Sequence, residues 1–235
     1  MKFSPAGDLA VSVVLGEEVN IELNTRVRAL EYLIQQKGVV GITEMTPAFG
    51  ALLVYYDPTV TTYEALCAAI TDVAEQTETT VLPPSRAVEL PCCYDDPTLG
   101  IDLEAAANRL GLGVDELVEL HAGAEYLVYF IGFTPGLPYM GVPEKLRIPR
   151  LETPRTKVPA GSVGIGGVQC CIYSVDSPGG YWVLGRTPLR LYDPEAADPV
   201  LLKPGDRVRF RAIDRAEYDR IVAAVAARTF MPVIR

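Results

Sequence analysis

Short apolar runs along the first third of the chain predict four β-strands. Residues 8–15 are apolar and rich in valine, a composition typical of strands. Residues 39–47 and 50–57 have the same character and are separated by a short proline- and glycine-containing turn. Residues 79–83, TTVLP, can close the unit as a fourth strand.

Two helices are predicted between these strands. In residues 19–38 apolar positions recur at helical spacing, and a lysine followed by a glycine ends the pattern. Residues 61–76 open with Thr61 and Glu64 in the arrangement of a capping box. The order strand-helix-strand-strand-helix-strand is that of a ferredoxin-like split βαβ domain. No glycine fingerprint or catalytic cluster lies within it, so we expect a scaffold or an interface.

Two consecutive prolines in residues 82–86 predict an extended linker between two domains. We therefore expect an α+β chain with one domain over residues 1–84 and a second over residues 85–235. From residue 125 onward, short apolar runs alternate with proline and glycine, as in an all-β barrel or sandwich. Helical patterns that flank these strands cover residues 102–111, 114–123 and 214–228.

The composition, 49% hydrophobic and 22% charged, is typical of a soluble protein with a core. No run of about 18 apolar residues occurs and no signal peptide is visible, so we expect a cytoplasmic protein without a membrane span. The net charge of −9 argues against nucleic-acid binding.

Five cysteines, four of them in two adjacent pairs, predict reduced thiols. A single histidine, His121, makes a histidine-based metal site unexpected.

Basic residues are concentrated in one segment of this acidic chain. Residues 1–120 contain 6 Lys and Arg against 19 Asp and Glu. Between Lys145 and Arg190 the balance reverses, with seven basic residues and only two acidic ones. This segment favours an anionic ligand or an acidic partner surface, and a solvated basic face is the alternative.

Four glycines lie in VPAGSVGIGG, residues 158–167. No Gly-Lys-Ser/Thr follows, so the segment is not a Walker A loop; Gln169 stands where a dinucleotide fingerprint requires glycine, and no helix follows. We interpret the segment as a turn between strands, with room for a neighbouring segment, a substrate or a partner to approach the backbone. A tight barrel corner is the alternative.

Two other features carry candidate chemistry. Residues 177–180, Ser-Pro-Gly-Gly, predict a sharp turn with exposed backbone amides, and Arg186 follows one short strand later. Such donors suit a carboxylate or a carbonyl oxygen, whereas a hairpin with a surface arginine is the alternative. His121 ends a helical pattern, where it is either a helix cap or a proton-transfer group. Cys170 and Cys171 are interpreted as packing residues on opposite faces of a strand.

Three segments together resemble the B subunit of the prokaryotic 5-oxoprolinases, a family also called the sporulation kinase A inhibitor and allophanate hydrolase subunit 1 family. They are FIGFTPGLPYMG (130–141), TPRTKVPAGSVGIGG (153–167) and SPGGYWVLGRTPLRLYDP (177–194), with Gln169 between the last two. The resemblance covers essentially the whole chain. It implies a small α/β domain followed by a cyclophilin-like β-barrel.

The resemblance also implies a function and partners. Such B subunits pair with a related C subunit and, with an A subunit, open 5-oxoproline to L-glutamate at the expense of ATP. No ATP-binding loop is visible in this chain, so we expect no cofactor here and a nucleotide on a partner subunit. Two alternatives stay open: an inhibitor of a sporulation histidine kinase, and a carboxyltransferase-like subunit of a urea or allophanate amidolyase.

With this function, three residues are candidates for catalysis. We expect Arg155 to bind the substrate carboxylate, Gln169 to bind the amide or its oxyanion, and His121 to transfer a proton. The expected substrate-binding residues are Ser162, Ser177, Pro178, Gly179, Gly180, Arg186 and Thr187. 5-Oxoproline, urea and allophanate all present a planar amide, so the sequence alone leaves the substrate open.

Overall fold

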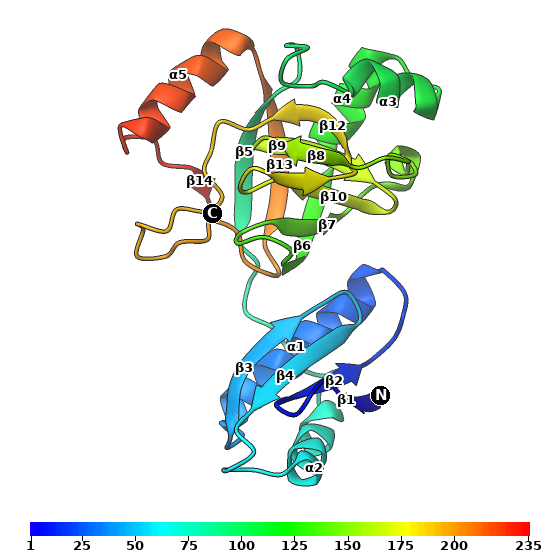
Figure 1. Cartoon of the computed structure of the whole chain (residues 1–235), viewed down its shortest axis with the longest axis vertical. Coiled ribbons are helices and arrows are strands. Elements are labelled where there is room, and N and C mark those ends of the chain that lie inside the picture. Colours follow the sequence, from blue (N-terminus) through cyan, green and yellow to red (C-terminus); the bar gives the residue numbers. More distant parts are fainter. The chain divides into compact units, whose positions relative to one another are not determined.

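The computed structural model describes all residues from 1 to 235 and divides into two compact units, Met1–Pro84 and Ser85–Arg235. The fold is mixed α/β, with five α-helices and a seven-stranded barrel in the second unit (Figure 1). None of these helices combines the length and the hydrophobicity needed to cross a membrane.

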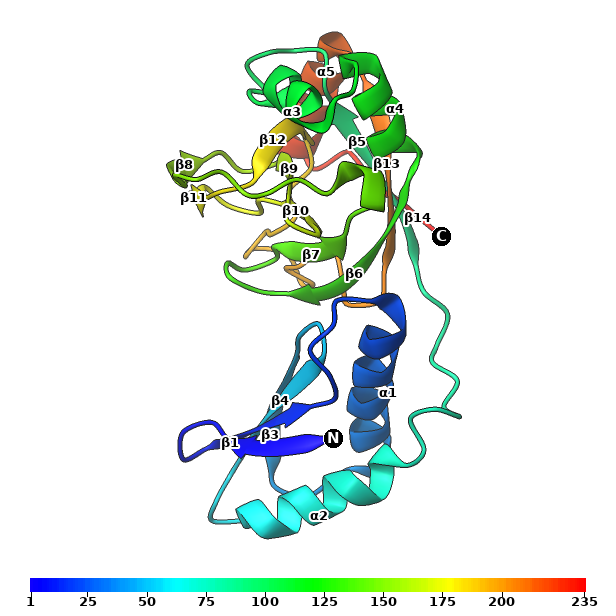
Figure 2. The same cartoon turned by 90° about the vertical axis from the view of Figure 1, so that its right-hand side faces the viewer.

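The first unit is a four-stranded antiparallel sheet with two helices. In sheet order the strands are β1 (Lys2–Pro5), β2 (Ala10–Val14), β4 (Ala51–Tyr56) and β3 (Ile42–Pro47). The helices are α1 (Ile21–Lys37) and α2 (Tyr63–Ala74). Both helices bury their apolar positions against the same face of the sheet, so a single core holds the unit together (Figure 2).

The ends of these helices follow their capping residues. The Asn20 side chain accepts a hydrogen bond from the Leu23 N–H at 2.8 Å, and Gly38 ends α1 in the left-handed conformation with φ of 59°. The predicted end of this helix is confirmed. α2 is capped by Thr62, which accepts from the Ala65 N–H at 3.2 Å, and not by Thr61 as predicted.

The predicted strand over 79–83 is wrong, because those residues form no ladder in the structure. Val81 is 88% exposed, and the prolines that follow have no N–H to donate to a sheet. The N-terminal residues pair with β2 instead, through a turn in which Gly7 has φ of 68°. The observed order is therefore strand-strand-helix-strand-strand-helix.

The second unit contains a closed ring of seven strands. In ring order they are β12 (Trp182–Arg186), β9 (Ser162–Gly166), β10 (Gln169–Ile172), β7 (Pro138–Gly141), β6 (Glu125–Ile131), β13 (Arg207–Ile213) and β5 (Ala87–Cys93), with β5 pairing back to β12. All neighbours are antiparallel except β13 and β5. One parallel pair is unavoidable, because an odd number of strands in a ring cannot alternate in direction throughout.

Three helices and two short strand pairings surround the barrel. The helices are α3 (Leu103–Leu110), α4 (Val114–Gly123) and α5 (Arg215–Ala226), in agreement with the predicted helical patterns. β14 (Val233–Ile234) extends the sheet beside β5, and β8 (Arg155–Val158) pairs with β11 (Ser177–Gly179) outside the ring. The main core fills the barrel, and a second small apolar cluster lies on the outer side of β10.

Candidate functional site

β9 carries the glycine-rich segment along one wall of the barrel. Val163 and Ile165 belong to the main core inside the barrel. Because side chains alternate along a strand, Ser162, Gly164 and Gly166 face the outer side. The central part of the segment is thus a strand paired on both sides, to β10 and to β12, and the turns lie at its two ends.

The two turns that flank β9 require glycine. Gly161 has φ of 81° and Gly167 has φ of 64°, both in the left-handed region. A side chain at Gly161 would also collide with the Thr187 carbonyl oxygen. The Thr187 N–H donates to the Gly161 carbonyl at 2.9 Å. These positions fit the alternative of tight barrel corners.

The outer glycines of β9 make room for Tyr181. A Cβ atom at Gly164 would lie 3.0 Å from the Tyr181 Cβ, and one at Gly166 would lie 2.9 Å from the Tyr181 Cδ1. Hence the space beside these glycines is filled by an aromatic ring of the same chain. At these two positions the close neighbour is therefore a segment of the same chain, the first of the predicted options, and not a substrate or a partner.

Tyr181 belongs to a polar group that we call the Arg150 cluster, made of Arg150, Gln169 and Tyr181. The Arg150 Nη2 donates to the Gln169 Oε1 at 2.7 Å and to the Tyr181 Oη at 3.0 Å. The Tyr181 hydroxyl also donates to the Gln169 Oε1. The guanidinium carbon lies 4.7 Å from the centre of the Tyr181 ring, a cation–π geometry. Burial raises the pKa of Tyr181, so its hydroxyl keeps the proton that it donates.

Arg155 does not lie free for a substrate. Its Nη2 donates to the Asp102 Oδ1 at 2.6 Å, and the Asp102 side chain is only 8% exposed. The Asp102 Oδ2 accepts from the Val183 N–H at 2.8 Å, so this carboxylate joins the start of α3 to β8 and β12. The pair spans 53 residues of sequence, and no local motif marks Asp102 as the partner.

The predicted sharp turn at residues 177–180 is largely a strand. Ser177 lies opposite Val158 in the pairing of β11 with β8, and Gly179 lies opposite Arg155. A side chain at Gly179 would collide with the ring and hydroxyl of Tyr173. Pro178 is exposed, and the Gly180 carbonyl accepts from the Leu151 N–H at 2.9 Å. The segment is therefore held by pairing and packing against its own chain.

The remaining predicted binding residues lie where β9 meets β12. Ser162 is opposite Arg186 in this pairing, and Thr187 follows at the end of β12. The hydroxyls of Ser162 and Ser177 are buried without a hydrogen-bond partner among the protein atoms. The structure thus distributes the candidates over four places: Arg155 with 177–180, Ser162 with Arg186 and Thr187, Gln169 in the Arg150 cluster, and His121 in the core.

His121 is fully buried inside the barrel. Its Nδ1 lies 2.8 Å from the Tyr94 Oη and its Nε2 3.7 Å from the Cys170 Sγ. The rings of Tyr126 and Phe210 lie 5.2 and 4.8 Å from the imidazole, centre to centre. Burial lowers the pKa of His121 to about 3, so the ring is neutral at physiological pH. This burial argues against the predicted role in proton transfer, because the side chain has no exposed surface for a substrate to contact.

Cys170 and Cys171 are packing residues, as predicted. Cys170 lies in the main core and Cys171 in the outer apolar cluster, so consecutive thiols face opposite sides of β10. Burial raises the pKa of both thiols. No group of three or more His, Cys, Asp or Glu side chains in the structure is arranged to hold a metal ion.

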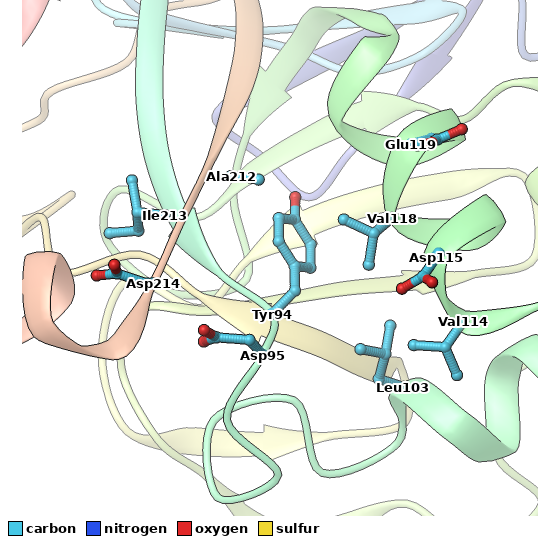
Figure 3. Close-up of a pocket in the computed structure, with 10 residues that line it drawn as sticks. All are labelled: Tyr94, Asp95, Leu103, Val114, Asp115, Val118, Glu119, Ala212, Ile213 and Asp214. Atoms are coloured by element: carbon cyan, nitrogen blue, oxygen red, sulfur yellow. The ribbon is translucent and has the colours of Figure 1, made fainter.

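A pocket of about 490 Å³ opens elsewhere on the barrel unit, between α3, α4 and the ends of β5 and β13 (Figure 3). Its wall includes Tyr94 and the apolar side chains of Leu103 and Val118. Four acidic residues also line it: Asp95, Asp115, Glu119 and Asp214. None of the predicted site residues contributes to its wall, and four carboxylates disfavour an anionic ligand there.

Comparison with known proteins defines the class to which this barrel belongs. The family model described as "Carboxyltransferase domain, subdomain C and D" matches residues 1–202. The 5-oxoprolinase B subunit of Bacillus subtilis is 35% identical over 227 residues, which cover 90% of this chain and 92% of that protein. The Escherichia coli O157:H7 protein of the same name is 50% identical over 129 residues, covering 54% of this chain and 59% of its own. The chain therefore belongs to the carboxyltransferase-domain family that includes the 5-oxoprolinase B subunits.

A solved structure and a fungal enzyme extend this relationship. The crystal structure of the protein TTHA0988 is 37% identical with a TM-score of 0.78; the match covers 87% of this chain and 40% of that one. The urea amidolyase of Saccharomyces cerevisiae is 26% identical over 252 residues, which cover 93% of this chain but only 14% of that protein. The present chain thus corresponds to one part of both longer proteins.

Proposed function

We propose that the chain acts as the B subunit of a multi-subunit, ATP-dependent 5-oxoprolinase that opens 5-oxo-L-proline to L-glutamate together with A and C subunits. One observation carries the proposal: the 5-oxoprolinase B subunit of Bacillus subtilis matches this chain along 92% of its own length at 35% identity. A match along almost the full length is what a subunit of equivalent role predicts.

The chemistry assigns this chain a limited part of the reaction. A lactam is a poor electrophile near neutral pH, and ATP can activate it by phosphorylating the amide oxygen. Addition of water to the phosphorylated carbon gives a tetrahedral intermediate, whose negative charge oriented N–H donors stabilise. Its C–N bond then breaks, so that the ring nitrogen leaves as the amine and an acyl phosphate forms. Hydrolysis of the acyl phosphate releases phosphate and leaves L-glutamate. This chain has no Gly-Lys-Ser/Thr loop, so we place the nucleotide on a partner subunit. We place the Gln169 amide, whose orientation Arg150 and Tyr181 fix, beside the substrate.

Reconstitution tests the proposal directly. The purified chain is combined with candidate A and C subunits from the same source, and ATP hydrolysis is measured with and without 5-oxo-L-proline. We expect hydrolysis that depends on 5-oxoproline and forms glutamate, with no turnover by this chain alone. A complete, assembled complex that hydrolyses no ATP in response to 5-oxoproline would contradict the function.

The similarity to urea amidolyase favours a second candidate, a carboxyltransferase-like subunit acting on urea or allophanate. The same preparation separates the two functions. Turnover of urea that requires bicarbonate and a biotinylated carrier protein, without turnover of 5-oxoproline, would favour the second candidate.

We also propose that the two units are variants of the ferredoxin-like and cyclophilin-like folds. The four-stranded antiparallel sheet with both helices on one face supports the first assignment, and the closed ring of seven strands supports the second.

A further inference from the structure

Arg150 differs from most arginines of the barrel unit because no carboxylate pairs with it. Ion pairs to Asp or Glu within 4.0 Å engage Arg86, Arg155, Arg207, Arg209, Arg211, Arg215, Arg220 and Arg228. Arg150 is exposed, and its hydrogen bonds go only to a neutral amide and a neutral hydroxyl. Its positive charge is therefore held in a fixed position without being neutralised.

The hydrogen-bond acceptors of the Arg150 cluster are already occupied, whereas several of its donors are not. The Gln169 Oε1 already accepts from both Arg150 and Tyr181, and because arginine is only a donor this orientation of the Gln169 amide is fixed. The Tyr181 hydroxyl both accepts and donates within the cluster. The groups without a partner are the Gln169 Nε2 and the Arg150 Nε and Nη1, all of them N–H donors. The cluster thus offers only donors, together with a positive charge.

Arg155, unlike Arg150, is already neutralised by a carboxylate. Its Nη2 is bound to Asp102 at 2.6 Å, and Asp102 is itself fixed by the Val183 N–H. A substrate carboxylate at Arg155 would have to displace a buried carboxylate that is already well placed. At Arg150 the same carboxylate would meet unpaired donors and an unpaired charge, without displacing any group of the protein.

We propose that Arg150 and the Gln169 amide bind the carboxylate of the substrate, in place of Arg155. This inference rests on the proposed function as a 5-oxoprolinase component. Guanidinium and amide donors match a planar carboxylate in shape and charge. The stacking of Arg150 on Tyr181 limits its freedom, so less entropy is lost when the ligand binds. The ligand class is a small lactam that carries a carboxylate, whereas neutral urea would gain nothing from the charge of Arg150.

The complex reconstituted with the A and C subunits, assayed with two lactams, tests this assignment. 5-Oxo-L-proline carries the carboxylate, and 2-pyrrolidinone is the same ring without it. Arg150→Ala should raise the KM for 5-oxoproline by roughly 10- to 100-fold, the effect of losing a charge-assisted hydrogen bond. It should leave kcat/KM for 2-pyrrolidinone unchanged, so that the preference for the carboxylate is lost.

Two further variants complete the test. Gln169→Glu keeps acceptors for Arg150 and Tyr181 but replaces the Nε2 donor with a negative charge, so it should also raise the KM for 5-oxoproline, even if Arg150→Ala fails to assemble. Arg147→Ala removes another exposed arginine without a carboxylate partner and should leave the KM unchanged.

The outcomes separate this inference from the proposed function. A complete wild-type complex without 5-oxoproline turnover would overturn both. Normal turnover of 5-oxoproline by wild type, with an unchanged KM in Arg150→Ala or Gln169→Glu, would overturn only the carboxylate site. Equal losses on both lactams would do the same, because they would show that Arg150 supports the fold and not the carboxylate.

Discussion

The two faces of β10 carry two clusters of similar composition and opposite character. On the inner face, Cys170 contacts His121, which is enclosed by aromatic rings and shares a hydrogen bond with Tyr94. On the outer face, Gln169 binds Arg150, which stacks on Tyr181. Each cluster combines one basic side chain with aromatic rings. Histidine can lose its charge and be buried, whereas arginine cannot, so only the outer cluster keeps a charge for a ligand.

The largest effect on stability is expected from His121→Ala. The change leaves a cavity in the barrel and removes the partner of the buried Tyr94 hydroxyl. We expect a loss of about 4 kcal/mol in the free energy of unfolding, measured by urea titration. A loss below about 1 kcal/mol would show that the inner cluster does not support the fold. The proposed difference between the two faces of β10 would then be wrong.

The inner cluster also predicts a pH dependence. His121 has a pKa of about 3 in the folded chain and an ordinary value of 6.5, so the unfolded chain binds one more proton between these values. The contribution of the neutral His121 to the free energy of unfolding is therefore fully present above pH 6.5 and decreases as the pH falls toward 3. Between pH 6.5 and 5 the loss should be about 2 kcal/mol.

His121→Gln provides the control, since this is the only histidine of the chain. Carboxylates with lowered pKa values, such as Asp96 at about 2, lose their contributions at lower pH. The variant should show a nearly flat stability between pH 6.5 and 5. The same slope in wild type and variant would contradict a neutral, buried His121.

The helices and the barrel class could be predicted because their signals are local. The spacing of apolar residues and the final glycine predict α1 nearly correctly, although the capping role of Asn20 becomes visible only in the structure. The strand over 79–83 could not be excluded, because its apolar residues resemble those of a strand. Whether such a segment forms a strand depends on an available partner in the sheet, and β1 already occupies the edge beside β2.

The candidate site was less predictable, because its contacts join distant parts of the chain. Asp102 and Arg155 are 53 residues apart, and Arg150 and Gln169 are 19 apart. Residue types made Arg155 and His121 reasonable candidates. Burial of His121 and the carboxylate beside Arg155 change both interpretations, and neither feature has a signal in the local sequence.

A smaller effect is expected from Gly166→Ala on the outer face. The new methyl group would lie 2.9 Å from the Tyr181 Cδ1 and 3.0 Å from the Arg150 Cγ, so both side chains must shift. We expect a loss of about 1–2 kcal/mol in urea titration. Gly123→Ala is the matched control, because its methyl group would meet nothing within 4 Å. Equal stability of the two variants would show that Tyr181 is not packed on β9.

The smallest effect on stability is expected from Arg150→Ala. Arg150 is exposed, and its hydrogen bonds to Gln169 and Tyr181 can be replaced by water. We expect a change within about 0.5 kcal/mol in the same titration, against about 4 kcal/mol for His121→Ala. A loss above about 2 kcal/mol would make Arg150 a structural residue like His121. A small loss of stability combined with a large rise in KM would instead show that β10 separates the two roles, with support of the fold on its inner face and ligand binding on its outer face.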